Sequence, residues 1–213
     1  MNRTTPRLRR SLAALLAAAA LAALATAPAH AQGLDDERSP RIRIAGRTLP
    51  RSGDVGTAND PAIGKTAPTL KGLSLTGKKI TVANDGKARI VLFLSHSCPH
   101  CQVEVPEIVK LAEQGKLDGV EIDTVTTNTT KDLPNWPPSK WLRSSKWPFR
   151  PVLADDGKLR AFTGYGGDAF PYFVFVGADG KVVARATGEL PAATIAQAAS
   201  RLASGEPFFE QKG

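Results

Sequence analysis

The sequence contains few cysteines and few aromatic residues: two cysteines occur in 213 residues, and aromatic residues make up 6% of the chain. Two cysteines exclude a small scaffold held by several disulfides, and they exclude a zinc or iron–sulfur site with four cysteine ligands from this chain alone. The hydrophobic content of 42% suffices for a buried core, which excludes a chain that is disordered throughout. The length suits one domain of ordinary size with short appendages.

The N-terminus has the pattern of a secretory signal peptide over residues 1–31. Four arginines precede an uninterrupted run of Leu and Ala from Leu12 to Ala25, and Ala29-His30-Ala31 provides the small residues that a signal peptidase recognises. The run is shorter than the roughly 20 apolar residues that span a bilayer, which favours cleavage over retention as a membrane anchor. We therefore expect an exported protein, in the periplasm, the cell envelope or the medium, where disulfides can form.

Half of the excess positive charge lies in this N-terminal segment. The formal net charge is +8, with 28 Lys and Arg against 20 Asp and Glu. Without the four arginines of residues 1–31, 24 basic residues stand against 20 acidic ones, and the net charge falls to +4. The remainder has no basic patch that calls for a nucleic acid or a membrane surface as partner.

Residues 32–62 are predicted to form a flexible linker, because prolines and glycines interrupt any regular period in a polar stretch. Residues 41–44 alternate and are also compatible with one short strand. A folded domain is predicted over residues 63–205, followed by a C-terminal tail at residues 206–213.

Inside this domain the hydrophobic pattern predicts an α/β fold. Residues 88–95 form a continuous apolar run typical of a central strand covered on both faces, and residues 98–114 follow with helical periodicity. A second strand is expected at residues 120–127, a hairpin over residues 170–185 and a closing helix at residues 191–203. This order predicts a mixed central sheet flanked by helices on both faces.

Both cysteines stand in one motif, Ser97-Cys98-Pro99-His100-Cys101, where the buried strand passes into the helix. A thiolate at Cys98 would be stabilised by the free N–H groups and the dipole at the helix N-terminus. Cys101, one turn further, is expected to face the core and to resolve a mixed disulfide from inside. This placement of a C-x-x-C pair indicates a redox dithiol.

Two other uses of the cysteines are open. A permanent bridge over so short a loop would remove little entropy from the unfolded chain and would stabilise the fold weakly. His96 and His100 flank the cysteines, and such ligands would suit Cu(I) or Zn²⁺. The chain beyond residue 31 has no further histidine to close a tetrahedral site, which makes a metal centre the weaker interpretation.

The C-x-x-C motif, with Pro106 five residues after it and Phe170-Pro171 opening a strand, resembles the thioredoxin fold. Residues 63–68 and 72–77 narrow this to a resemblance to the exported TlpA/ResA-like thiol–disulfide oxidoreductases, which covers residues 63–204. The resemblance implies a cis peptide bond before Pro171. It also implies that the backbone around Phe170 faces the dithiol and pairs with an extended segment of the substrate.

The same resemblance implies that Glu104 lies near the thiols and manages their protons. The alternative is a solvated carboxylate on an exposed face of the helix. The sequence departs from the family at Leu92, where thioredoxin has a buried Asp, and at Ser97, which replaces the usual Trp. With Leu92 at that position, Glu104 or water must accept the proton of Cys101.

The Pro99-His100 dipeptide is that of strongly oxidising DsbA-type enzymes, whereas the rest of the chain resembles reductases. A positive charge on His100 would favour the Cys98 thiolate and raise the reduction potential. The alternative is a solvent-facing histidine with little effect. The direction of electron flow is therefore open at this point.

The sequence thus predicts an extracytoplasmic enzyme that exchanges disulfides with protein partners through Cys98 and Cys101 and is recycled by a separate redox partner. It implies no organic cofactor, no metal and no nucleic acid. A thiol peroxidase is the enzymatic alternative, although its T-x-x-C setting is absent, and a copper-binding thioredoxin-fold protein is the non-enzymatic one. The Trp-rich segment 133–149 is expected to pack on the sheet, with a docking surface for a partner as the alternative.

Overall fold

The computed structural model describes residues 37–209, and the predicted signal peptide at residues 1–31 lies outside them. No helix in the described range is long and apolar enough to cross a membrane. The elements, in chain order, are β1 (Arg43–Ala45), β2 (Thr69–Leu73), β3 (Lys79–Val82), β4 (Arg89–Leu94), α1 (Pro99–Glu113), β5 (Glu121–Thr126), α2 (Pro138–Ser144), β6 (Leu153–Ala154), α3 (Arg160–Gly164), β7 (Tyr172–Val176), β8 (Val182–Thr187) and α4 (Ala192–Ser204).

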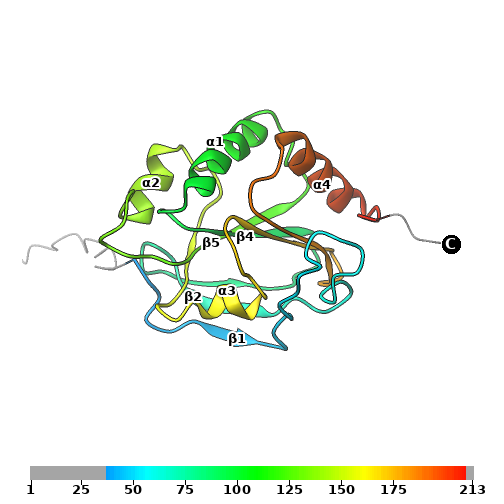
Figure 1. Cartoon of the computed structure of the whole chain (residues 1–213), viewed down its shortest axis with the longest axis horizontal. Coiled ribbons are helices and arrows are strands. Elements are labelled where there is room, and N and C mark those ends of the chain that lie inside the picture. Colours follow the sequence, from blue (N-terminus) through cyan, green and yellow to red (C-terminus); the bar gives the residue numbers. More distant parts are fainter. Residues whose placement is uncertain (1–36, 210–213) are drawn as a thin grey trace, which may run out of the picture. The chain divides into compact units, whose positions relative to one another are not determined.

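A five-stranded mixed sheet forms the centre of the fold, in the order β6-β5-β4-β7-β8 (Figure 1). β4 lies in the middle, parallel to β5 and antiparallel to β7. All six residues of β4 are buried, as its continuous apolar run predicted. The strands β1, β2 and β3 form a second, antiparallel sheet. The predicted α/β fold with a mixed central sheet is therefore confirmed.

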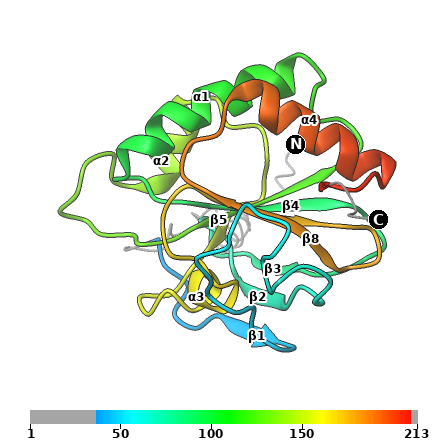
Figure 2. The same cartoon turned by 45° about the vertical axis from the view of Figure 1, so that its right-hand side comes forward.

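Alternate residues of β4 point to opposite faces of the sheet, and each face has its own core. Ile90, Leu92 and Leu94 pack with residues of α1 and α4. Val91 and Phe93 pack with residues of α3 and of the three-stranded sheet. Accordingly, α1 and α4 lie on one side of the central sheet, with α3 and β1 to β3 on the other (Figure 2). Helices thus cover both faces, and packing holds the junction of β4 with α1 in place.

Residues 37–62 are part of the fold, so the prediction of a flexible linker is wrong for this segment. β1 pairs antiparallel with β2, and Ile42 and Leu49 are buried in the core. The carboxylate of Glu37 accepts hydrogen bonds from the backbone N–H and the hydroxyl of Ser139 at the start of α2. Single apolar and acidic side chains therefore anchor a stretch whose sequence pattern is irregular.

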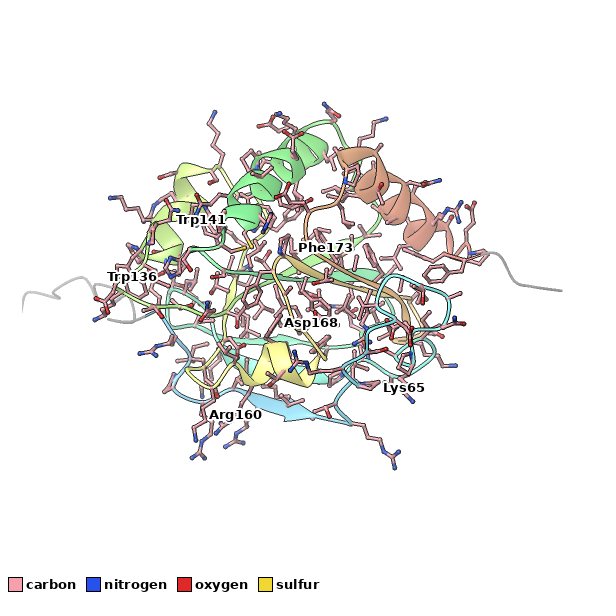
Figure 3. All side chains as sticks on the ribbon, in the orientation of Figure 1. Lys65, Trp136, Trp141, Arg160, Asp168 and Phe173 are labelled. Atoms are coloured by element: carbon pink, nitrogen blue, oxygen red, sulfur yellow. The ribbon has the colours of Figure 1, made fainter. Side chains whose placement is uncertain are left out.

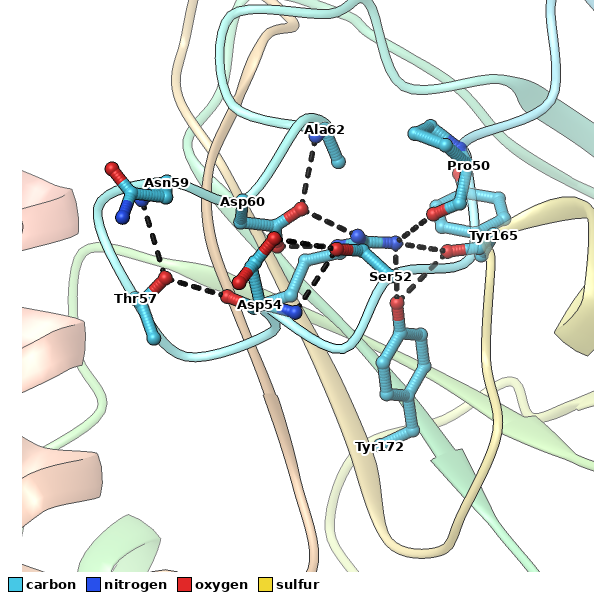
Figure 4. A network of polar contacts seen from close by, with 10 residues as sticks. Pro50, Ser52, Asp54, Thr57, Asn59, Asp60, Ala62, Tyr165 and Tyr172 are labelled. Atoms are coloured by element: carbon cyan, nitrogen blue, oxygen red, sulfur yellow. Dashed lines mark hydrogen bonds and ion pairs between the residues drawn. The ribbon is translucent and has the colours of Figure 1, made fainter.

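A buried ion pair joins the end of this segment to the central sheet (Figure 4). The guanidinium of Arg185 on β8 donates to both carboxylate oxygens of Asp60, at 2.7 and 2.5 Å, and both side chains are almost fully buried. Its Nη1 also donates to the Pro50 carbonyl and to the Tyr172 hydroxyl, each at 2.9 Å. The two charges compensate each other, which matters because a single buried charge without a partner is strongly destabilising.

The Trp-rich segment packs on the sheet, as expected. Trp141 and Trp147 belong to the core on the side of α1 and α4, where Phe173 also lies (Figure 3). The indole Nε1 of Trp147 donates to the Thr124 hydroxyl on β5 at 3.0 Å. Trp136 is half-buried, with its ring approaching that of His96 edge to face. Two of the three tryptophans are therefore core residues and do not form a docking surface.

Candidate active site

The dithiol lies where β4 passes into α1. Cys98 caps the helix and is partly exposed, whereas Cys101 in the first turn is 0% exposed. The backbone N–H of Ser95 is 3.4 Å from the sulfur of Cys101. Both thiols are free. The two cysteines therefore differ in access: Cys98 is partly exposed to solvent, while Cys101 is shielded by the protein.

The start of β7 faces the exposed thiol. The Phe170–Pro171 peptide bond is cis, as the resemblance implied, and the Phe170 carbonyl oxygen lies 3.6 Å from the sulfur of Cys98. β7 is held there by antiparallel pairing with β4, and the Phe170 ring packs against Phe162 with 4.4 Å between centroids. The structure thus brings Cys98, Phe170 and Pro171 together although 72 residues separate Cys98 from Phe170.

Glu104 is buried, with 2% of its surface exposed, so it does not lie on the exposed face of α1. Its Oε2 accepts the backbone N–H of Leu190 at 2.9 Å, whereas its Oε1 is buried without a hydrogen-bond partner. The pKa of this carboxyl is raised to about 7, mainly by burial; the Leu190 N–H opposes this shift, and the carboxylates of Glu189 and Glu107 add to it. Glu104 can therefore exchange a proton near neutral pH.

The environment of Cys101 favours its thiol form. Burial raises the pKa of Cys101 well above the ordinary value, and negative charge on Cys98 or Glu104 raises it further. The Ser95 N–H, which points at the sulfur, opposes this shift. A base must therefore take the proton before Cys101 can act as a nucleophile, because the thiolate is the reactive form.

His100 lies on the surface of α1 but has a partner. Its side chain is 65% exposed, and Nδ1 lies 2.5 Å from the Glu189 Oε1 in the loop between β8 and α4. The sequence did not predict Glu189 as a site residue, because it lies 89 residues from His100 and belongs to no motif. The interpretation of His100 as a free solvent-facing residue is therefore incomplete.

His96 supports the loop that follows β5. It is fully buried, with Nδ1 2.7 Å from the Pro134 carbonyl and Nε2 3.2 Å from the Thr130 N–H. A carbonyl only accepts and an N–H only donates, so these partners assign the neutral form with the proton on Nδ1. Both ring nitrogens are thus engaged within the protein. Among residues 37–209, no three His, Cys, Asp or Glu side chains gather as a metal site.

Comparison with known proteins agrees with this geometry. A family model described as a thioredoxin-like domain matches residues 76–203. The chain belongs to the thioredoxin-like family. A search of curated proteins found no match for this thioredoxin-like chain.

Solved structures share the fold of this thioredoxin-like chain. A thiol:disulfide interchange protein of the thioredoxin family from Chlorobium tepidum TLS is 27% identical with a TM-score of 0.55; the match covers 65% of this chain and 96% of that one. A thiol:disulfide interchange protein from Bacteroides sp. is 26% identical with a TM-score of 0.53, covering 68% and 91%. StoA from Bacillus subtilis, 20% identical with a TM-score of 0.51 and coverage of 65% and 98%, shares the fold. These findings confirm the predicted fold and support the prediction of a thiol–disulfide oxidoreductase.

Near the buried thiol, this thioredoxin-like chain has Leu92 at the position where thioredoxin has a buried Asp. Leu92 is 1% exposed and packs in the apolar core beneath α1. A leucine cannot accept a proton, and Glu104 is the carboxyl whose charge acts on Cys101. The geometry therefore assembles an accessible sulfur, a buried sulfur and a buried carboxyl at one end of the sheet.

Proposed function

We propose that this protein is an extracytoplasmic thiol–disulfide oxidoreductase that exchanges disulfides with protein partners through Cys98 and Cys101. The observation that carries the proposal is the asymmetry of the two sulfurs: Cys98 is partly exposed beside the Phe170 carbonyl, and Cys101 is buried behind it. A structural bridge has no need of an accessible sulfur, whereas attack on a macromolecular disulfide requires one.

The first step is attack by the Cys98 thiolate on one sulfur of a partner disulfide. A bond forms between Cys98 and that sulfur, and the second sulfur of the partner leaves as a thiolate that takes up a proton. An extended segment of the partner would lie along the backbone of Phe170 and Pro171. The partner is then held by one mixed disulfide.

The second step releases the partner. Cys101 gives its proton to the Glu104 carboxylate, and its thiolate attacks the sulfur of Cys98. The Cys98–Cys101 bond forms, the partner leaves as a dithiol, and two electrons have passed to it. The same steps in reverse oxidise a partner dithiol, so the reduction potentials of the two couples set the direction.

A protein is the expected partner. The support is the similarity of this chain to thiol:disulfide interchange proteins, together with the partial exposure of Cys98. Val103 and Leu133 are the exposed large hydrophobic side chains among residues 37–209, and single exposed apolar side chains do not by themselves indicate a docking surface.

Trapping experiments test the order of attack. Cys101→Ser should accumulate mixed disulfides with partner proteins, because the resolving thiol is absent, and Cys98→Ser should accumulate none. Both variants would be isolated from cells after acid quenching and compared on non-reducing gels with and without reductant. Equal trapping by the two variants would contradict the assignment of Cys98 as the nucleophile.

The extracytoplasmic location rests on the pattern of residues 1–31. Expression of the full chain in a bacterium, followed by cell fractionation and N-terminal sequencing, tests it. The expected product lies outside the cytoplasm and begins at Gln32. A cytoplasmic product that begins at Met1 would contradict the proposed export.

A further inference from the structure

Three consecutive residues in the loop between β8 and α4 bind three residues of the site. Gly188 N–H donates to the Pro171 carbonyl at 2.9 Å, Glu189 Oε1 lies 2.5 Å from His100 Nδ1, and Leu190 N–H donates to Glu104 Oε2 at 2.9 Å. Backbone bonds on both sides of Glu189 therefore fix the chain that carries this carboxylate. Its position over His100 is defined by the fold rather than by a chance meeting of two surface side chains.

The charge of Glu189 acts on the balance between dithiol and disulfide. The Cys98–Cys101 disulfide carries no charge, whereas the reduced form carries a negative charge whenever Cys98 is a thiolate. A positive His100, two residues after Cys98, favours the reduced form. The Glu189 carboxylate, paired with charged His100, cancels that effect.

We propose that Glu189 is a positioning residue that acts through His100 and makes the Cys98–Cys101 couple more reducing than the Pro99-His100 motif would be without it. This inference rests on the proposed function, because it concerns the same dithiol. It reconciles the dipeptide of oxidising enzymes with a chain that otherwise resembles reductases.

Glu189→Gln tests the charge while keeping an oxygen that can accept the hydrogen bond from His100. The purified protein is equilibrated with reduced and oxidised glutathione, and the fraction of dithiol is measured after acid quenching. The reaction is balanced: the protein disulfide and two glutathione thiols give the protein dithiol and one glutathione disulfide. Exposed ion pairs contribute about 0.2–1 kcal/mol, so the equilibrium constant should rise about 1.4- to 5-fold. This corresponds to a potential higher by about 4–20 mV.

Glu121→Gln is the matched control. Glu121 also carries an exposed carboxylate in an ion pair, with Lys87 at 2.9 Å, and it begins β5 at the end of the sheet opposite the dithiol. This variant should leave the equilibrium constant unchanged. A shift in Glu189→Gln no larger than that in Glu121→Gln would overturn the proposal.

A double-variant cycle tests whether Glu189 acts through His100. In a His100→Gln background the carboxylate loses its cationic partner, and Glu189→Gln should then change the equilibrium constant by less than half of its effect in the native background. An undiminished effect would overturn the role of His100. Failure of the native protein to equilibrate with glutathione would instead contradict the proposed function itself, so the two failures are distinguishable.

Discussion

Replacing Glu104 with glutamine should change how the stability of the reduced protein depends on pH. Burial raises the pKa of Glu104 from the ordinary 4.5 to about 7, so the folded state binds this proton more tightly than the unfolded state. The stabilisation by the protonated carboxyl is fully present below about pH 4.5 and is lost as the pH rises through about 7. A difference of about 2.5 pKa units corresponds to about 3 kcal/mol.

Glutamine has no proton to lose, and its oxygen can keep the hydrogen bond from the Leu190 N–H. The stability of Glu104→Gln relative to the native protein should therefore rise by about 3 kcal/mol between about pH 4.5 and pH 9. Urea unfolding with a phosphine reductant, repeated across this range, measures the difference. Glu113→Gln is the matched control, because Glu113 lies on the same helix but is exposed. A difference that stays constant with pH would refute the reasoning.

The same carboxyl predicts the pH dependence of resolution. In the proposed mechanism the ionised Glu104 accepts the Cys101 proton, so the rate of the resolving step should increase as the pH rises through about 7. Glu104→Gln should resolve more slowly and should lose that step in the profile, while the first attack by Cys98 stays largely intact. Stopped-flow rates with a model disulfide measure both phases. Superimposable profiles for the two proteins would make water the proton acceptor.

Three further predictions follow from burial. Iodoacetamide should label Cys98 of the reduced native protein and leave Cys101 unlabelled until urea is added, and mass spectrometry that finds equal labelling would contradict the shielding of Cys101. Asp60→Asn should lower the free energy of unfolding by about 3–5 kcal/mol, because it leaves the Arg185 charge buried without a counter-ion, whereas Asp54→Asn in the same segment should have little effect. Trp147→Phe should cost about 1–3 kcal/mol in urea unfolding, because it leaves the buried Thr124 hydroxyl without its indole donor, and an unchanged midpoint would show that this bond contributes nothing.

The elements that the sequence predicted well depend on local pattern. The apolar run of residues 88–95 contains β4, the helical period after Cys98 contains α1, and the hairpin over residues 170–185 contains most of β7 and β8. A buried strand or an amphipathic helix shows its period within a few residues, so its position can be predicted without the rest of the chain. The C-x-x-C motif follows the same rule, because its chemistry depends on two adjacent elements.

Residues 37–62 show where that reasoning fails. Their prolines and glycines lack a period, yet single residues such as Ile42 and Asp60 fit into sites that distant parts of the chain provide. The partner of Asp60 is Arg185, 125 residues away. An isolated anchor of this kind has no local signature, because its stabilisation comes from the complementary surface and not from its neighbours in sequence.

The candidate site likewise has features that follow from local sequence and features that depend on the tertiary structure. The sequence alone determined that Cys98 begins a helix after a buried strand, and on that ground it predicted Cys98 as the accessible sulfur of a redox pair. The helical period predicted that Glu104 lies close to the face of α1 that carries Cys101. It did not decide whether Glu104 is exposed, since the exposure of a helix face depends on what packs against it. Only the tertiary structure brings the loop of Gly188–Leu190 over α1, where it buries Glu104 and pairs Glu189 with His100. Charges and proton affinities at a site depend on such through-space contacts, which linear spacing does not encode.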